Sequence, residues 1–373
     1  MNEQMSVPIC TRLDQATIAD LATGSAVLGT GGGGDPWIGK LMASQAVADY
    51  GAVEVIQPDI LDDDDLVVVV AISGAPSVLV EKAPNGGELE VVWDRVVEYA
   101  GMPARAAISW EIGGVNSLFP VAAAARNGVP LVDADGMGRA FPEFQITTLN
   151  VGGVKFGPRF VTDEKGNVLR IDGIDATWLE RINRRALVAM GGSVVSAIGL
   201  TGADIKRAAV HRSISLAVAI GALVRRGREE KTDWHAELRQ TCGAHELFHG
   251  KVVSVERRTE GGWVRGHALI DGLDSARDRQ VRIDFQNEHL LARAGASGAW
   301  DTVLVSTPDL IAVLDFETGT PITTEGLRYG QRVTVIGIPC HPLWRTPRGL
   351  ELAGPRYFRW PIEYVPLEVM ELG

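Results

Sequence analysis

Apolar and polar residues follow two different rhythms in the two halves of this chain. Between residues 14 and 50, apolar positions recur at helical spacing on both sides of a glycine run, which predicts two helices joined by a loop. Asp14 is a suitable N-cap for the first helix, and Asp35-Pro36 places a capping carboxylate and a first-turn proline at the start of the second. This segment is therefore expected to fold as a helix–loop–helix unit.

From there to about residue 135, short apolar runs alternate with helical patterns. The runs are continuously apolar, as in strands buried on both faces, so they predict a mostly parallel sheet with helices on both sides. The strands are expected at 66–72, 105–110 and 129–132, with helices at about 87–100 and up to Asn127. The fold class predicted for this half is a three-layer α/β domain.

Beyond residue 150 the pattern shifts towards strands separated by turn signals. A hairpin is expected at 158–171, followed by helices at about 175–190 and 203–227 that are separated by a strand at Ser193–Leu200. The later strands are expected at 250–257, 263–271, 279–285, 302–306, 310–315 and 331–338. Their spacing is typical of a small β-barrel or sandwich. We therefore divide the chain into an α/β domain at 1–172 and, at 173–373, a helical connection followed by a β-barrel-like domain.

Composition narrows the classes of function. Lys and Arg number 36 against 47 Asp and Glu, so the formal net charge is −11, and an acidic surface repels nucleic-acid phosphates and anionic lipid. The longest apolar stretch, at 213–224, is about 12 residues and falls short of the roughly 20 needed to cross a bilayer. No signal peptide is visible, and three widely spaced cysteines fit neither a disulfide framework nor a CxxC metal site. We expect a cytoplasmic protein whose partners include no nucleic acid and no membrane.

Polar residues gather where the three predicted parallel strands end. The three tails are Ser73-Gly-Ala-Pro76, Glu111-Ile-Gly-Gly-Val-Asn116 and Asp133-Ala-Asp-Gly-Met-Gly-Arg139. Ligands of doubly wound sheets bind beyond the carboxyl ends of the strands, so three such tails in phase predict one shared site. The alternative for any single tail is ordinary turn chemistry, because Gly, Asp and Asn also end strands for conformational reasons.

The densest polar cluster lies at 133–143. Asp133 and Asp135 stand two residues apart in an extended segment and would point to one side, so that one of them ionises reluctantly and can act as acid or base. Arg139 could clamp a substrate carboxylate through its two-pronged donor geometry. It could equally pair with Asp135 or Glu143 and rigidify the turn, and both interpretations stay open.

The glycine run formally matches a dinucleotide fingerprint at Gly29, Gly31 and Gly34. That fingerprint needs a preceding strand, whereas the pattern here predicts a helix, so we expect no nucleotide cofactor. Four consecutive glycines before a helix still expose backbone N–H groups that suit a carboxylate or a developing oxyanion. The alternative is a tight turn between two helices.

Two further motifs lie in the second half. His245-Glu-Leu-Phe-His249 is a literal H-E-x-x-H string, which in zinc hydrolases must sit on a helix so that both histidines share one face. A strand pattern follows immediately, so the alternative is a chance match at a helix–strand junction. Asn287 and Glu288 close a predicted barrel strand with an amide and a carboxylate, which makes them candidate site residues.

Four motifs together resemble the S-methyl thiohydantoin desulfurase family, and the likeness runs over nearly the whole chain. They are Gly29-Thr-Gly-Gly-Gly-Gly-Asp-Pro36, Asp133-Ala-Asp-Gly-Met-Gly-Arg-Ala-Phe-Pro142, Phe285-Gln-Asn-Glu288 and Gly354-Pro-Arg356. The resemblance implies an N-terminal α/β domain of unusual topology and a C-terminal domain that contains a β-barrel. It also implies action on five-membered cyclic ureides or thioureides, with removal of sulfur from a thiohydantoin as the suggested reaction. Such proteins occur beside or fused to hydantoinase and oxoprolinase-type proteins, which are candidate partners.

The residue roles remain inferences from this sequence. We expect Asp135 to activate water, with Glu111 or Asp133 tuning its pKa, and no cofactor or metal to take part. The residues expected to bind substrate are Gly31, Gly32, Gly33, Gly34, Asp35, Asn116, Arg139, Glu143, Asn287 and Glu288. Two alternatives are a zinc hydrolase that uses His245 and His249, and a non-catalytic subunit of a hydantoinase. A homo-oligomer is the default expectation for quaternary structure.

Overall fold

The computed structural model describes residues 7–74, 78, 82, 84, 86–260, 263–296 and 298–370. The first six residues, on which the expectation about a signal peptide partly rests, lie outside the described residues. So do Ala75 and Pro76 of the first predicted strand tail. No helix within the described residues is both long and apolar enough to cross a membrane.

The predicted helix–loop–helix unit is confirmed as α1 (Gln15–Leu28) and α2 (Pro36–Tyr50). Asp14 caps α1 by accepting hydrogen bonds from the N–H groups of Ala16 and Thr17, and the Thr17 side chain completes a capping box. Asp35 caps α2 by accepting from the Trp37 N–H at 2.8 Å. Asp35 therefore fixes the end of the intervening glycine loop, and the Gly29 N–H fixes its start by donating to the Ser25 carbonyl at 2.7 Å.

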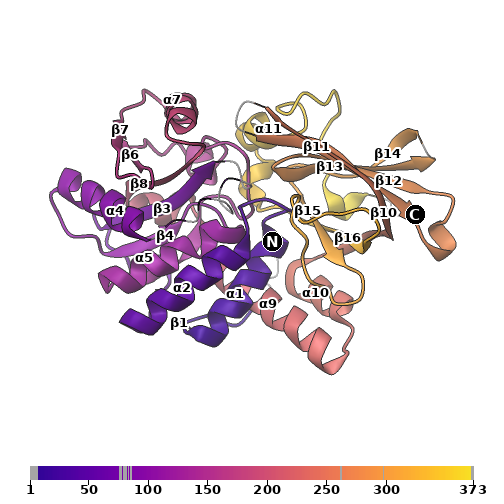
Figure 1. Cartoon of the computed structure of the whole chain (residues 1–373), viewed down its shortest axis with the longest axis horizontal. Helices are drawn as coiled ribbons and strands as arrows, with labels where there is room; N and C mark the ends of the chain where they lie inside the picture. The colour runs from indigo at the N-terminus through magenta and orange to yellow at the C-terminus, as the bar shows by residue number, and fades with distance from the viewer. Residues whose placement is uncertain are drawn as a thin grey trace.

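The N-terminal half is built on a nine-stranded mixed sheet in the described part of the chain. Four central strands run parallel in the order β2-β5-β4-β3, and antiparallel strands flank them, so the predicted α/β fold is confirmed (Figure 1). Its strands are β1 (Arg12–Leu13), β2 (Val53–Ile56), β3 (Leu66–Gly74), β4 (Ala106–Ser109), β5 (Leu131–Asp135), β6 (Arg159–Thr162), β7 (Val168–Ile171), β8 (Ser193–Thr201) and β9 (Val210–His211). β-Branched residues fill β3, and its first six residues are all buried.

Helices cover this sheet and pack closely on one another. The remaining helices of this half are α4 (Gly87–Ala100), α5 (Phe119–Asn127), α6 (Thr148–Val151), α7 (Ala176–Ala189), α8 (Gly202–Ala208) and α9 (Ser213–Glu230). α4 packs on β3 and β8, α5 packs on β4 and β3, and α1 contacts both α2 and α9. The crossing of α1 and α9 is so tight that a Cβ on Gly24 would lie 1.7 Å from the Ala217 carbonyl oxygen.

The single long helix expected at 203–227 is wrong, because the structure divides it. α8 ends at Ala208, the short strand β9 pairs with β5, and α9 begins at Ser213. Arg212 adopts a left-handed backbone conformation (φ 64°), which breaks the helical pattern between the two helices. Pairing with β5 therefore overrides local helix propensity at this point.

The C-terminal half is an antiparallel sheet in the order β14-β13-β12-β11-β10-β16-β15, curled into a half-barrel (Figure 1). Its elements are α10 (Trp234–Cys242), β10 (His245–Glu260), β11 (Trp263–Gly272), β12 (Gln280–Gln286), β13 (Glu288–Ala296), β14 (Ala299–Ser306), β15 (Leu310–Asp315), β16 (Arg332–Ile338) and α11 (Pro347–Ala353). The sheet curls until β15 contacts β13 and β14. The expected β-rich second half is thus confirmed, with β13 as a strand that the sequence pattern did not predict.

Candidate functional site

A cavity of about 100 Å³ lies beyond the carboxyl ends of β3 and β4, where the two halves of the molecule meet. The first tail lines it with Ser73 and the second with Glu111 and Asn116. The third tail lines it with Met137 and with residues 141–144. The C-terminal half contributes Asn287 and Glu288. The three strand tails therefore do lie together, as their positions in a parallel sheet predict.

Glu111 is the central acidic residue of this cavity. Its side chain accepts hydrogen bonds from Asn116 Nδ2 at 2.7 Å and from the Phe141 N–H at 3.3 Å. Asn116 is itself held by the backbone of β3, since its Oδ1 accepts from the Ile72 N–H at 2.8 Å. Burial raises the pKa of Glu111 to about 7, and the negative charge of Asp135 adds to that rise. Glu111 can therefore exchange a proton near neutral pH.

Glu288 places a second carboxyl beside Glu111. It is the first residue of β13 and is only 3% exposed. Its pKa is raised well above the ordinary value, first by burial and then by the charge of Glu111. One of its oxygens, Oε2, has no hydrogen-bond partner among the described residues. Two buried carboxyls that act on each other resist ionising together, so the pair retains a proton at a pH where an isolated glutamate would lose it.

The glycine loop packs closely against Glu288 and His289 of the C-terminal half. A Cβ on Gly32 would lie 2.1 Å from Glu288 Oε1, so only glycine leaves room for that carboxyl. Gly31 gives the same clearance to the ring of His289, whose backbone N–H donates to the Thr30 carbonyl at 2.7 Å. Among the described residues, no N–H group of this loop donates to a carboxylate, so its expected role in binding a carboxylate or an oxyanion stays a prediction.

Gly33 and Gly34 lie further along the loop and line the cavity directly. Within the part of the chain that the structure describes, neither of their N–H groups donates to a protein acceptor. Both residues adopt positive φ, at 77° and 81°. The loop therefore offers backbone donors at the cavity wall, as expected for stabilising a developing negative charge.

Asp133 and Asp135 lie in the sheet, outside the residues that line the cavity. Asp133 is fully buried and accepts hydrogen bonds from Gln57 Nε2 and from the backbone N–H and hydroxyl of Ser215. It therefore fastens the start of α9 to β5. A single oxygen of Asp135, Oδ2, accepts from the N–H groups of Ile112, Met137 and Gly138 at 2.8–2.9 Å.

Asp135 thus joins the tail of β4 to the tail of β5. Burial raises its pKa to about 6, while the backbone hydrogen bonds oppose that rise. Its charge acts on the neighbouring Glu111, so the two carboxyls influence each other's protonation although only Glu111 faces the cavity. The structure therefore brings Glu111 and Glu288 to the cavity and leaves the two aspartates behind it.

Arg139 ties the two halves of the molecule together. Its guanidinium is fully buried and donates to the carbonyl oxygens of Ala140, Pro308, Asp309 and His289 and to the hydroxyl of Thr30, at 2.8–3.1 Å. These five bonds occupy all five N–H donors of a guanidinium. Arg139 does not line the cavity, and neither of the sequence alternatives, a substrate clamp or an ion pair with Asp135 or Glu143, corresponds to these contacts.

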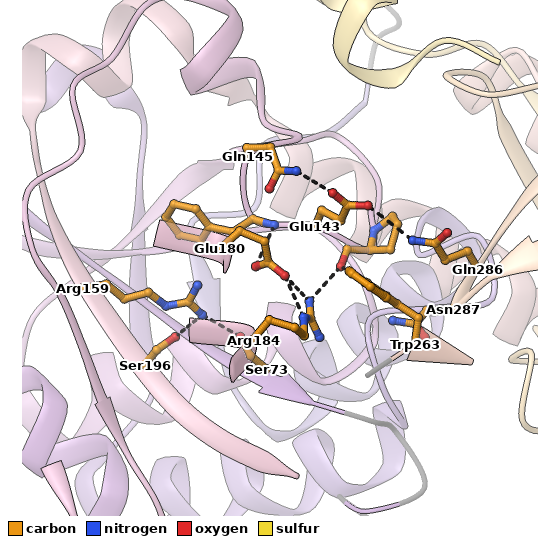
Figure 2. A network of polar contacts seen from close by, with 12 residues as sticks. Ser73, Glu143, Gln145, Arg159, Glu180, Arg184, Ser196, Trp263, Gln286 and Asn287 are labelled. Atoms are coloured by element: carbon orange, nitrogen blue, oxygen red, sulfur yellow. Dashed lines mark hydrogen bonds and ion pairs between the residues drawn. The ribbon is translucent and has the colours of Figure 1, made fainter. Parts of the chain in front are cut away.

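Of the remaining candidate binding residues, Glu143 and Asn287 line the cavity, whereas Asp35 does not. Glu143 accepts from Gln286 Nε2 at 3.4 Å (Figure 2). It also accepts from Tyr357 Oη at 2.8 Å, and both contacts link the third tail to the C-terminal half. Asn287, with a left-handed backbone (φ 57°), accepts from the Val264 N–H at 2.8 Å and turns the chain into β13. Asp35 serves as the cap of α2 and is absent from the cavity lining.

Aromatic side chains form one wall of the cavity. Trp110 and Phe144 both line it, and their rings stack with centroids 4.3 Å apart and planes 11° apart. Phe156 packs against the edge of both rings. Trp110 stacks on Phe144, and the Arg159 guanidinium also lies over the Phe144 ring, 4.7 Å from its centroid, so this cluster forms a rigid apolar wall of the cavity.

The H-E-x-x-H string opens strand β10 immediately after α10, so it does not present two histidines from one helical face. His249 Nδ1 lies 3.2 Å from Glu246 Oε1, and His235 Nδ1 lies 3.4 Å from Glu246 Oε2. Across the residues that the structure describes, no group of three or more His, Cys, Asp and Glu side chains is placed to hold a metal ion. The helix–strand junction, the alternative for this string, is what the structure contains.

The sequence pattern missed a basic cluster on the opposite side of the cavity. Arg159, Glu180, Arg184 and Ser196 all line it, and Figure 2 shows Arg159 bonded to Ser73 and Ser196. Arg184 pairs with Glu180 at 2.6 Å. The available signal was a lone polar residue inside an apolar strand, as Ser196 is in β8.

Two domain matches account for most of the chain. Residues 16–173 match the S-Me-THD-like N-terminal domain, and residues 174–367 match the S-Me-THD-like C-terminal domain. The chain belongs to the S-Me-THD-like family. This confirms the resemblance drawn from the glycine loop and the 133–142 motif.

The family fold is also seen in a crystal structure of a protein from Chromobacterium violaceum. That protein is 21% identical to this S-Me-THD-like chain, with a TM-score of 0.77, and the match covers 96% of this chain and 100% of the other. At this identity the likeness establishes the fold. No curated protein matches the chain.

Proposed function

We propose that this S-Me-THD-like protein is a hydrolase that removes sulfur from a thiohydantoin, or from its S-methyl form, by addition of water at C2 of the ring. The observation that supports this proposal is the Glu111–Glu288 carboxyl pair, which lines a small cavity with an aromatic wall. Raised pKa values suit these two groups to proton transfer at neutral pH. Family membership supports the choice of a cyclic thioureide as substrate.

The pair divides the chemistry into a base and an acid. Glu111, whose pKa is about 7, takes a proton from water while the water oxygen bonds to C2. Glu288, whose pKa burial and the charge of Glu111 raise well above the ordinary value, gives its proton to sulfur as the C2–S bond breaks. A carbonyl forms at C2 and the thiol leaves, so one water is consumed. Transfer of the proton from Glu111 to Glu288 restores the starting state.

Other cavity residues support this step. The N–H groups of Gly33 and Gly34 offer donors for the negative charge that develops on the ring during attack. Asn116 holds the Glu111 carboxyl in place, and Trp110 and Phe144 supply an apolar wall for the ring. This proposal gives the base role to Glu111, because Asp135 has its carboxylate bound to three backbone N–H groups behind the cavity.

The experiment is a turnover screen of the purified protein against matched thiohydantoins, S-methyl thiohydantoins and plain hydantoins. Loss of the thio-chromophore with release of sulfide or methanethiol is the expected result. Glu111→Gln and Glu288→Gln should each lower kcat at least about 100-fold, the range for loss of a general acid or base. Asp135→Asn should lower it less than Glu111→Gln does.

Glu88→Gln is the matched control. Glu88 is also a buried glutamate (6% exposed), lies at the start of α4 and does not line the cavity. Its replacement should leave turnover within about twofold of wild type. Folded protein that turns over none of the three ring classes contradicts the proposal, and full activity in Glu111→Gln contradicts the assignment of the base.

A further inference from the structure

Arg159 is a buried cation with unused hydrogen-bond donors. It begins β6, is 2% exposed and lines the same cavity as Glu111 and Glu288. Its Nη2 donates to Ser73 Oγ at 2.6 Å and to Ser196 Oγ at 2.8 Å. Its Nε and Nη1 atoms are buried and have no partner among the described residues. Two of the three guanidinium nitrogens therefore remain available.

Among the described residues, no carboxylate forms a direct ion pair with Arg159. Glu180, an acidic side chain that acts on it, is paired with Arg184 at 2.6 Å. Burial lowers the pKa of Arg159 to about 10, so the group stays charged at neutral pH. Burying a charge without a partner is costly, and a purely structural arginine normally finds a carboxylate or several carbonyl oxygens. Arg139 in this same molecule does so with all five donors.

The surroundings hold the guanidinium in one orientation. Its central carbon lies 4.7 Å from the centroid of the Phe144 ring, and both serine hydroxyls accept from the same nitrogen, Nη2. Figure 2 shows the guanidinium of Arg159 pointing towards the centre of the polar network, between Ser196 and Glu180. With both Nη2 hydrogens occupied, the free N–H groups of Nε and Nη1 point to different sides of Nη2, so each free nitrogen can donate one charge-assisted hydrogen bond to a carboxylate oxygen.

We propose that Arg159, with Ser73 and Ser196, forms a carboxylate subsite, and that the substrate is a ring bearing an acidic side chain. The inference rests on the proposed function for the nature of the ring, while the subsite rests on the geometry of Arg159. The carboxylate supplies a counterion and accepts a hydrogen bond from a free nitrogen of Arg159. The binding energy of this remote group would position C2 against the Glu111–Glu288 pair.

The first test compares paired substrates. Each pair consists of an S-methyl thiohydantoin with a 5-carboxyalkyl side chain and the same ring with the primary carboxamide in place of the acid. Wild type should prefer the acid by at least about 10-fold in kcat/KM, as expected for a charge-assisted hydrogen bond to a buried guanidinium. Arg159→Gln should reduce that preference to less than about fivefold, and Arg159→Lys should restore part of it.

The second test needs no turnover. Sodium butyrate and butyramide are compared by thermal shift and calorimetry on wild type, Arg159→Gln and the exposed control Arg170→Gln in β7. Butyrate should stabilise wild type and Arg170→Gln, whereas butyramide should stabilise neither, and Arg159→Gln should lose the response to butyrate.

The two tests separate the subsite from the proposed reaction. If no ring is turned over but butyrate binds through Arg159, the reaction is wrong and the subsite stands. If acid and amide substrates are turned over equally, the subsite is refuted while the hydrolase stands. Absence of both acid preference and butyrate binding in folded wild-type protein overturns the inference.

Discussion

Replacing Glu111 by glutamine tests the electrostatics of the cavity without any substrate. A carboxyl whose pKa is raised in the folded state binds protons more tightly there than in the unfolded chain. Its contribution to stability is therefore complete below pH 4.5, the ordinary value, and is lost as the pH rises towards about 7. Glutamine has no such proton, so Glu111→Gln should become progressively more stable than wild type across this interval.

The size of the effect follows from the shift. A rise from 4.5 to about 7 is roughly 2.5 pKa units, and each unit is worth about 1.4 kcal/mol, which gives about 3 kcal/mol between pH 4 and pH 8. Loss of the hydrogen bond from the Phe141 N–H adds a cost of about 1 kcal/mol that does not depend on pH. Removing the charge of Glu111 also eases ionisation of Glu288, which increases the gain at high pH.

The measurement is urea unfolding followed by tryptophan fluorescence at several pH values between 4 and 8. The quantity of interest is the difference in free energy of unfolding between Glu111→Gln and wild type, plotted against pH, since other titrating groups largely cancel. Glu98→Gln, an exposed change in α4, should shift stability by less than about 0.5 kcal/mol. A difference that stays flat from pH 4 to pH 8 would refute the raised pKa and with it the acid–base assignment.

Other changes at the site test its packing, its charge and its chemistry. Gly32→Ala puts a Cβ 2.1 Å from Glu288 Oε1, so kcat/KM should fall about 100-fold while the circular dichroism spectrum is kept. Arg139→Gln leaves buried carbonyl oxygens without donors and should cost about 3–5 kcal/mol in urea unfolding. The pH profile of kcat/KM should rise through about pH 7 as Glu111 ionises, and Glu111→Gln should abolish this rising limb. Treatment with a chelator and the change His249→Ala should each leave turnover within about twofold, and a larger loss would favour the zinc alternative.

Elements with strong local signals could be predicted from the sequence. The caps at Asp14 and Asp35, the valine-rich β3 and the turn residues of the β6–β7 hairpin each specify their structure within a few residues. Prediction failed where distant pairing decides the outcome. β9 forms because it pairs with β5, and that pairing is not visible in the sequence between 203 and 227. The left-handed backbone at Arg212, where the helix breaks, is seen only in the structure.

The same distinction applies to the site. Strand order places the tails of β3 and β4 together, so Glu111 and Asn116 could be found as cavity residues from the sequence. The sequence could not show which carboxyl faces the cavity, because that depends on hydrogen bonds formed only in the fold. The Ile112 N–H holds Asp135 behind the cavity, and the Asn116 side chain holds Glu111 in it. Arg159 was missed for a similar reason, since its serine partners come from β3 and β8, 86 and 37 residues away.

The family match changes from one domain to the other at residue 173, yet the sheet does not end there. β8 (Ser193–Thr201) comes from the second matched region and pairs with β3 along all nine of its residues. A fragment that stops at residue 173 would leave β3, with its four consecutive valines, as an exposed hydrophobic edge that pairs readily with another copy. Expressed alone, such a fragment should aggregate, because the first matched region needs β8 of the second to cover the edge of β3.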